Sequence, residues 1–174
     1  MDVIIPFGGQ ALNAVDKKGR VSLPAELRSV VERRCALATA ADLPVDEKLL
    51  YISEDETLPC LVGFDETEQF RLASKLAEDP GDGDPGRRSL VSRGRGANTF
   101  APLQRVVFDK AGRMVLNGLL RDITGIGDFA FFVGNGLVFD IWEPSRAHAH
   151  YTAANDRRMI RIVEGLCKDK GAKL

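Results

Sequence analysis

Long apolar runs are missing from this sequence of 174 residues. A membrane-spanning helix needs roughly 20 consecutive apolar residues, and no segment approaches that length. Residues 1–5 also lack the basic start and the long apolar run of a secretion signal. Because 44% of the residues are hydrophobic and 28% are charged, the composition is typical of a globular protein. We therefore expect a cytoplasmic protein with no membrane partner.

Cysteine and histidine are scarce. The three cysteines are odd in number, widely separated and outside any Cys-x-x-Cys pair: Cys35, Cys60 and Cys167. This pattern argues against a disulfide framework and against a zinc knuckle. His148 and His150 lie two residues apart on an expected helix, where they point in different directions. The Asp-rich segment 79–86 lacks the closing acidic residue of a calcium loop. We expect no metal site.

Enzyme signatures are also absent. The sequence contains no Gly-x-Ser-x-Gly, no phosphate-binding Walker loop and no His-Glu-x-x-His pattern. The candidate general bases are Asp16 and Asp109, and both occupy positions that favour a turn. We expect a protein that is not an enzyme and that uses no cofactor and no small-molecule substrate.

Charge is nearly balanced overall, with a net charge of −1, but it is unevenly distributed. Residues 42–79 hold eleven acidic and three basic residues. Residues 87–121 hold eight basic residues and one acidic residue. Two solvated faces of opposite sign would explain this asymmetry, and so would a polyanionic partner. Charge alone leaves both interpretations open.

The strongest positive feature is an internal repeat. Residues Asp16–Arg28 recur as Asp109–Arg121, with Asp, Lys, Gly, Arg, Leu, Leu and Arg at the same places in both copies. In each copy an extended run, residues 12–15 or 105–108, meets the pattern Asp-Lys-x-Gly. Asp favours turns by bonding to the backbone that follows it, and Gly accepts a positive φ. Alternating apolar residues come next, so each copy predicts a β-hairpin.

We expect a short helix after each hairpin. Pro24 suits the first helical position, because the N–H that proline lacks has no partner there. Asn117 can cap the second helix and Gly125 can end it. The apolar faces are predicted to comprise Leu27, Val30 and Val31 in the first copy and Leu119, Leu120 and Ile123 in the second.

Further elements follow each copy. Residues 129–133 and 137–142 flank Gly134-Asn135-Gly136, which predicts another hairpin. Residues 49–53 and 60–64 form a weaker counterpart in the first half, and helices are expected over residues 66–76 and from Pro144 onward. The first copy carries an additional stretch, residues 36–48, which we interpret as a longer helix or a loop.

The repeated turns present cations at fixed positions. These are Lys17, Lys18 and Arg20 in the first copy, Lys110 and Arg113 in the second, and a further arginine eight residues after each turn arginine, Arg28 and Arg121. A guanidinium group binds phosphate oxygens in bidentate fashion and can recognise guanine in the major groove, which suits duplex DNA. Alternatively, each turn arginine pairs with its own turn aspartate to hold the hairpin closed. The two interpretations are compatible.

Taken in order, these motifs resemble the MraZ family of SpoVT-AbrB-like proteins. The resemblance rests on the duplicated Asp-x-x-Gly-Arg turns, on Val-Gly-x-Gly at residues 133–136, and on Phe-Asp-Ile-Trp at residues 139–142. Phe7-Gly8-Gly9 and the pair Arg87 and Arg88 also fit, so the resemblance extends from Phe7 to about Leu166. Departures are Asn117-Gly118 where proline is usual, the Asp- and Gly-rich segment between the repeats, and the stretch 36–48.

The resemblance implies a β-rich α+β fold, a duplicated swapped-hairpin β-barrel with short flanking helices and a C-terminal helix. Its parts would be a first repeat (residues 7–78), a Pro/Gly/Asp linker (79–86), a second repeat with a leading basic helix (87–150) and a C-terminal helical tail (151–174).

The resemblance also implies a function. It implies a nucleoid-associated repressor that binds promoter direct repeats of the division and cell-wall gene cluster as a ring-like homo-oligomer. The DNA-contacting positions of the family map onto Lys18, Arg20 and Arg113, with Lys17 and Lys110 as neighbours. Four arginines could add DNA or structural contacts: Arg28, Arg87, Arg88 and Arg121. The alternative is an antitoxin-like protein-interaction module whose long helix from Pro144 docks onto another protein.

Overall fold

The computed structural model describes residues 4–78 and 94–174. Its strands are β1 (Gln10–Ala14), β2 (Arg20–Ser22), β3 (Leu49–Glu54), β4 (Leu61–Asp65), β5 (Gln104–Val107), β6 (Arg113–Val115), β7 (Phe129–Asn135) and β8 (Val138–Trp142). Its helices include α1 (Ala25–Ala40), α2 (Glu66–Glu78), α4 (Gly118–Thr124), α5 (Pro144–Ala153) and α6 (Arg157–Lys170). The linker 79–86 and the pair Arg87 and Arg88 lie outside the described residues.

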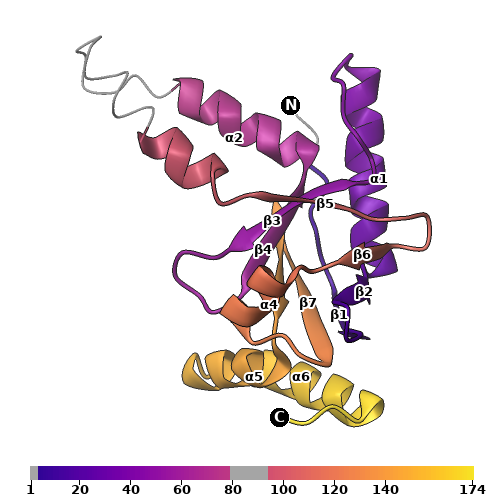
Figure 1. Ribbon diagram of the computed structural model, residues 1–174, viewed down its shortest axis with the longest axis vertical. Helices are drawn as coiled ribbons and strands as arrows, with labels where there is room; N and C mark the ends of the chain where they lie inside the picture. Colours follow the sequence, from indigo (N-terminus) through magenta and orange to yellow (C-terminus); the bar gives the residue numbers. More distant parts are fainter. Residues whose placement is uncertain (1–3, 79–93) are drawn as a thin grey trace.

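The strands form a six-stranded antiparallel sheet, in the order β1-β7-β8-β4-β3-β5, and a two-stranded ribbon of β2 and β6 (Figure 1). The order has an internal symmetry, because β1-β7-β8 in one half of the sheet corresponds to β5-β3-β4 in the other. This is the β-rich α+β fold that the sequence predicts. The second repeat is thus built on the same plan as the first.

The two halves exchange strands, so the predicted local hairpins of the repeat are wrong in their pairing. β1 pairs with β7 and β5 pairs with β3, while β2 pairs with β6 across the halves. Val21 lies opposite Met114 in the ribbon, and both are buried in the main core. Pairing across the halves buries both apolar side chains in one core. Two separate hairpins would leave these side chains apart. The interlocked arrangement is the one that the family resemblance implies.

The two later hairpins are confirmed, as β7 pairs with β8 and β3 with β4. The helix predicted over residues 66–76 is α2. α1 has 16 residues rather than a few, and its last turns occupy the first part of the additional stretch 36–48. Pro24 is the N-cap of α1 and precedes its first helical residue, one place earlier than expected.

In α4, the predicted caps are confirmed and the predicted apolar face is wrong. The Asn117 side chain accepts the N–H of Leu120, and Gly125 ends the helix with a φ of 73°. Leu120 is buried, but Leu119 is 59% exposed and Ile123 is 36% exposed. A helix of seven residues offers one narrow face to the core, and Leu120 shares that face with the buried Thr124 four residues later.

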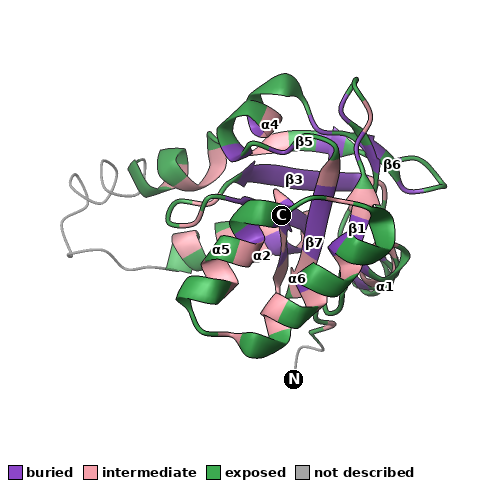
Figure 2. Ribbon diagram, turned by 90° about the horizontal axis from the view of Figure 1, so that it is seen from below, coloured by how far each residue is buried: buried purple, intermediate pink, exposed green. Residues whose placement is uncertain are grey.

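The C-terminal region forms two helices, which corrects the prediction of one long helix from Pro144. α5 extends past residue 150, where we expected the second repeat to end. Asn155 then adopts a φ of 55°, and the Asp156 side chain caps α6 by accepting the N–H of Met159. α5 and α6 pack together against one end of the sheet (Figure 1), and their exposed side faces away from the buried strands (Figure 2).

Two further findings concern the residues that the structure describes. Within residues 4–78 and 94–174, no helix combines the length and the apolar character needed to cross a membrane. The same residues contain no cluster of three His, Cys, Asp or Glu side chains arranged to hold a metal ion. His148 contacts Glu164 of α6 at 2.9 Å, whereas His150 stacks on Trp142.

Candidate nucleic-acid interface

Each repeat folds its Asp-x-x-Gly-Arg motif into the same tight turn. Oδ1 of Asp16 accepts the backbone N–H groups of Lys18 and Arg20, both at 2.9 Å. Oδ1 of Asp109 accepts those of Ala111 and Arg113, also at 2.9 Å. We call residues 16–20 the first loop and residues 109–113 the second loop. Their identical bonding follows from the identical spacing of the motif.

The turn arginines pair with the turn aspartates, as predicted if these pairs hold the hairpins closed. Nε of Arg20 lies 2.5 Å from Oδ2 of Asp16, and Nε of Arg113 lies 2.8 Å from Oδ2 of Asp109. Hydrogen bonds from the arginine backbone N–H, together with those from the guanidinium, hold the pKa of each aspartate below its ordinary value. The arginine side chains are still 61% and 71% exposed, so they remain accessible to a phosphate or a base.

The two loops are tied to each other across the ribbon. The carbonyl oxygen of Gly19 accepts the N–H of Leu116 at 2.9 Å, and that of Gly112 accepts the N–H of Leu23 at 2.7 Å. Both Asp–Arg pairs line one open hollow of about 550 Å³ between the loops. The exchange of strands therefore places the duplicated cations on one surface, although they are 93 residues apart in sequence.

Lysines extend this surface. Lys17 and Lys18 of the first loop and Lys110 of the second are exposed, beside the exposed turn arginines. The structure thus brings together all five residues that we predicted to contact DNA. A set of flexible ammonium groups around two fixed guanidinium groups suits a polyanion with regularly spaced charges.

Arg28 and Arg121 lie beneath the loops of the opposite repeat. Nη1 of Arg28 lies 3.5 Å from the carbonyl oxygen of Lys110 in the second loop. Nε of Arg121 donates to the carbonyl oxygen of Leu116 at 3.1 Å and lies against Gly19 of the first loop. Both side chains are half-buried. Of the two roles that the sequence left open for these arginines, the contacts favour support of the loops.

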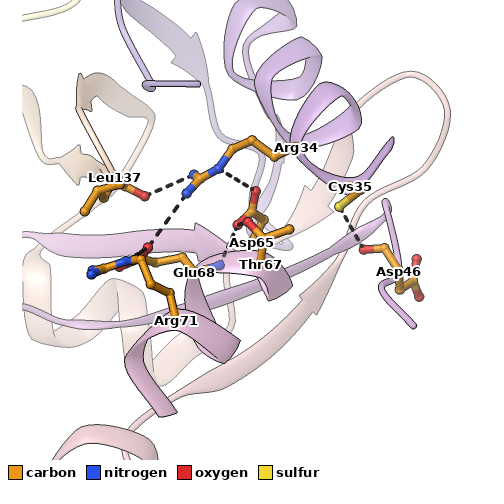
Figure 3. Close-up of polar contacts among 8 residues, drawn as sticks. All are labelled: Arg34, Cys35, Asp46, Asp65, Thr67, Glu68, Arg71 and Leu137. Atoms are coloured by element: carbon orange, nitrogen blue, oxygen red, sulfur yellow. Dashed lines mark hydrogen bonds and ion pairs between the residues drawn. The ribbon is translucent and has the colours of Figure 1, made fainter. Parts of the chain in front are cut away.

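A buried ion network around Arg34 of α1 was not predicted (Figure 3). Arg34 of α1 is 8% exposed, and its guanidinium lies 3.4 Å from Asp65 and 3.7 Å from Glu68, both of which are buried. It also donates to the carbonyl oxygen of Leu137 at 3.1 Å, and Arg71 donates to both carboxylate oxygens of Glu68. The network joins α1 to the start of α2 and so fixes the helix that carries Arg28.

One signal in the sequence could have identified Arg34. It lies seven residues after Leu27 and three after Val31, on the helical face that those two apolar residues bury. Burial raises the pKa of Asp65, while the Arg34 guanidinium opposes that shift. The next residue, Cys35, is also buried, and burial raises the pKa of its thiol to about 12, so it is an unreactive core residue.

Comparison with known proteins gives a consistent result over most of the chain. The transcriptional regulator MraZ of Rhodospirillum rubrum is 33% identical over 149 residues, which cover 84% of this chain and 85% of that protein. The proteins of the same name from Rhizobium johnstonii and Gluconobacter oxydans are 32% and 31% identical, covering 88% and 87% of this chain and 94% and 84% of their own lengths. No protein-family model matches the chain.

Proposed function

The chain belongs to the MraZ family of transcriptional regulators, and we propose that it represses the division and cell-wall gene cluster by binding promoter direct repeats as a ring-like homo-oligomer. Its relatives carry the name transcriptional regulator, which makes DNA the partner to consider first. On this proposal the protein acts at the nucleoid.

The observation that carries the proposal is the pairing of two identical Asp-x-x-Gly-Arg loops on one ribbon. Arg20 and Arg113 each keep most of their side chain exposed while Nε holds the turn aspartate. This geometry fixes the direction of the guanidinium without burying it. Such a group can bind a phosphate or the O6 and N7 atoms of guanine with little loss of side-chain freedom. Lys17, Lys18 and Lys110 add electrostatic attraction.

Two features support self-association. A single protomer offers few phosphate contacts and carries a net charge of −1, so several copies on adjacent repeats would multiply contacts that are individually weak. The second half also exposes large apolar side chains on three successive elements: Val107 of β5, Val115 of β6, and Leu119 and Ile123 of α4. β5 is moreover an edge strand of the sheet. Leu119 and Ile123 would be covered by a neighbouring copy in a ring, whereas Val107 and Val115 line the hollow between the loops.

The antitoxin-like alternative depends on a free C-terminal helix. α6 buries Val163 and Cys167 in a cluster with Leu12 and Trp142 of the sheet, so its apolar side is already occupied. The structure therefore favours the DNA-binding proposal.

The test is a mobility-shift titration on duplex DNA from upstream of the protein's own gene, beside a scrambled duplex. We expect tight, salt-sensitive binding that prefers the native duplex. Arg20→Ala should abolish that preference and leave the fold unchanged, since the turn is held by backbone bonds to Asp16. Equal or absent binding of the wild-type protein to both duplexes would refute the proposal.

A matched variant separates recognition from loop shape. Asp16→Asn keeps an oxygen that can accept the N–H groups of Lys18 and Arg20 but removes the carboxylate that pairs with the guanidinium. If Arg20 contacts DNA, Asp16→Asn should bind at least as tightly as the wild-type protein. If the ion pair serves only to shape the loop, Asp16→Asn and Arg20→Ala should lose binding together.

A further inference from the structure

The C-terminal end of α6 lies against the strand that leads into the first loop. Val163 and Cys167 of α6 share a buried cluster with Leu12 of β1, and Ala172, just after the helix, packs against the same cluster. Figure 2 shows α6 crossing beneath the sheet from the α5–α6 turn toward β1. The end of the helix is therefore fixed to β1 by apolar packing.

A chain of contacts connects the C-terminal end of α6 to the first loop. Lys173 lines a hollow of about 350 Å³ together with Asp128 and Phe129. Phe129 pairs with Ala14, the last residue of β1, and the carbonyl oxygen of Asp128 accepts the N–H of Val15 at 2.8 Å. Asp16 begins the first loop immediately after Val15. The hollow that Lys173 lines is thus at the base of the first loop.

This end of α6 is basic and exposed. Lys168, Lys170 and Lys173 are all exposed, and the carboxylates nearby are Asp128 and Glu143, which line the same hollow as Lys173, and Asp169. None of the three lysines has an ion pair among the described residues. Part of their effect is to stabilise the α6 dipole, because cations near a helix C-terminus are favourable.

The corresponding position beside the second loop is different. There the carbonyl oxygen of Lys48 accepts the N–H of Phe108, in place of Asp128 and Val15. The ammonium group of Lys48 lies 3.5 Å from Glu32 and 3.7 Å from Glu47, which offset its charge. The three lysines beside the first loop therefore have no ion pair among the described residues, whereas Lys48 beside the second loop is paired with two glutamates, although the loops themselves are equivalent.

We propose that Lys168, Lys170 and Lys173 form, with the first loop, a clamp on the phosphate backbone of DNA beside the bases that the loops recognise. This inference rests on the proposed DNA-binding function and makes the two repeats unequal in their contribution. Ammonium groups on flexible stems act on phosphates as point charges and distinguish no bases. The clamp supplies affinity and sets the orientation of each protomer on the duplex.

The test compares two triple variants, each of which removes three positive charges from residues 157–173. Lys168→Gln/Lys170→Gln/Lys173→Gln changes the proposed clamp, and Arg157→Gln/Arg158→Gln/Arg161→Gln is the control, since those arginines are also exposed. At a rise of about 1.5 Å per residue, the three arginines lie roughly 10–20 Å from Lys168 and Lys170 along the helix. That separation exceeds the Debye length of about 8 Å at physiological salt, so the control charges act there only weakly.

Affinity for the native upstream duplex and for a scrambled duplex is measured by fluorescence anisotropy across a salt series. The lysine variant should lose at least tenfold in affinity for both duplexes, with a log–log salt slope lower by about 2 to 3 because about 0.9 unit is lost per phosphate. Its preference for the native duplex should not change. The arginine control should keep the wild-type slope.

The outcomes separate the two proposals. Equal losses in both triple variants would show a general effect of net charge and would overturn the clamp, as would a wild-type slope in the lysine variant. Wild-type protein that fails to prefer the native duplex would instead refute the proposed function. Thermal melting checks that both variants fold. If the triple lysine variant melts early, Lys173→Gln alone, which lies outside α6, should lower the slope by about 1.

Discussion

Substituting Gly19 by alanine tests how the two loops are joined. Gly19 has a φ of +79°, and its carbonyl oxygen accepts the N–H of Leu116 from the other repeat. A Cβ atom at this position would overlap the carbonyl oxygen of Leu116 and would lie 2.9 Å from Nε of Arg121. The side chain of Arg121 can move aside, but the Leu116 carbonyl is backbone within the ribbon. Alanine therefore forces the ribbon and the first loop apart.

The expected cost has three parts. A left-handed φ costs a non-glycine residue about 1–2 kcal/mol. Overpacking adds about 1–3 kcal/mol, and weakening the Leu116 hydrogen bond adds roughly 1 kcal/mol. Gly136 isolates the first part, because its φ is +73° and a Cβ there would have nothing within 4 Å. We expect Gly19→Ala to destabilise the protein by about 2–4 kcal/mol more than Gly136→Ala, roughly 4–16 °C in Tm.

Both variants are measured by urea and thermal unfolding at one fixed protein concentration, since self-association makes Tm depend on concentration. Gly19→Ala should also weaken DNA binding, because it displaces the loop that carries Lys18 and Arg20, whereas Gly136→Ala should bind normally. Equal destabilisation by the two substitutions would show that the close approach of the loops contributes nothing to the free energy of unfolding. That result would refute the conclusion that the two loops are tied to each other across the ribbon.

Two further predictions concern buried charge. Arg34→Ala leaves the carboxylates of Asp65 and Glu68 buried without their cation and should lower the free energy of unfolding, measured in urea, by about 3–5 kcal/mol. The control is Arg33→Ala, at an exposed neighbouring residue, which should change the stability little. A similar loss of stability in both variants would contradict the role of the ion network. Burial, and secondly the nearby Asp55 carboxylate, raises the pKa of Asp140 to about 6. The folded protein therefore binds this proton more tightly than the unfolded chain does, and it loses stability as the pH rises from about 4 through 6. Asp140→Asn should therefore be more stable, relative to the wild-type protein, at pH 7 than at pH 4 by about 2–3 kcal/mol, and unfolding curves with the same difference at both pH values would exclude this.

Local chemistry made much of the loop structure predictable. The turns at Asp16 and Asp109, the Asn117 cap and the stop at Gly125 depend on bonds between residues a few positions apart, so short patterns identify them. The pairing of each turn arginine with its aspartate could be anticipated for the same reason. The roles of these cations on DNA stay predictions.

Contacts between residues far apart in the sequence could not be predicted from short patterns. The alternation that predicts a strand around Val21 is equally satisfied by a partner within the same repeat or in the other one, and only the shared core selects Met114. Periodicity likewise does not say which side of a short helix meets that core, which is why Leu119 was misplaced while Leu120 was not. Arg34 is the opposite case, because it is a charged residue on the buried face of its helix. It can lie there because carboxylates from β4 and α2 pair with it.

The sequence by itself determined the duplication, the two turns with their cations, and most helix and strand positions, because each depends on backbone preferences and contacts within a few residues. Only the tertiary structure decided that the halves exchange strands, that both loops share one surface, and that Lys173, just after α6, lies at the base of the first loop. Those outcomes depend on which apolar faces can be buried together, and that is a property of the whole chain.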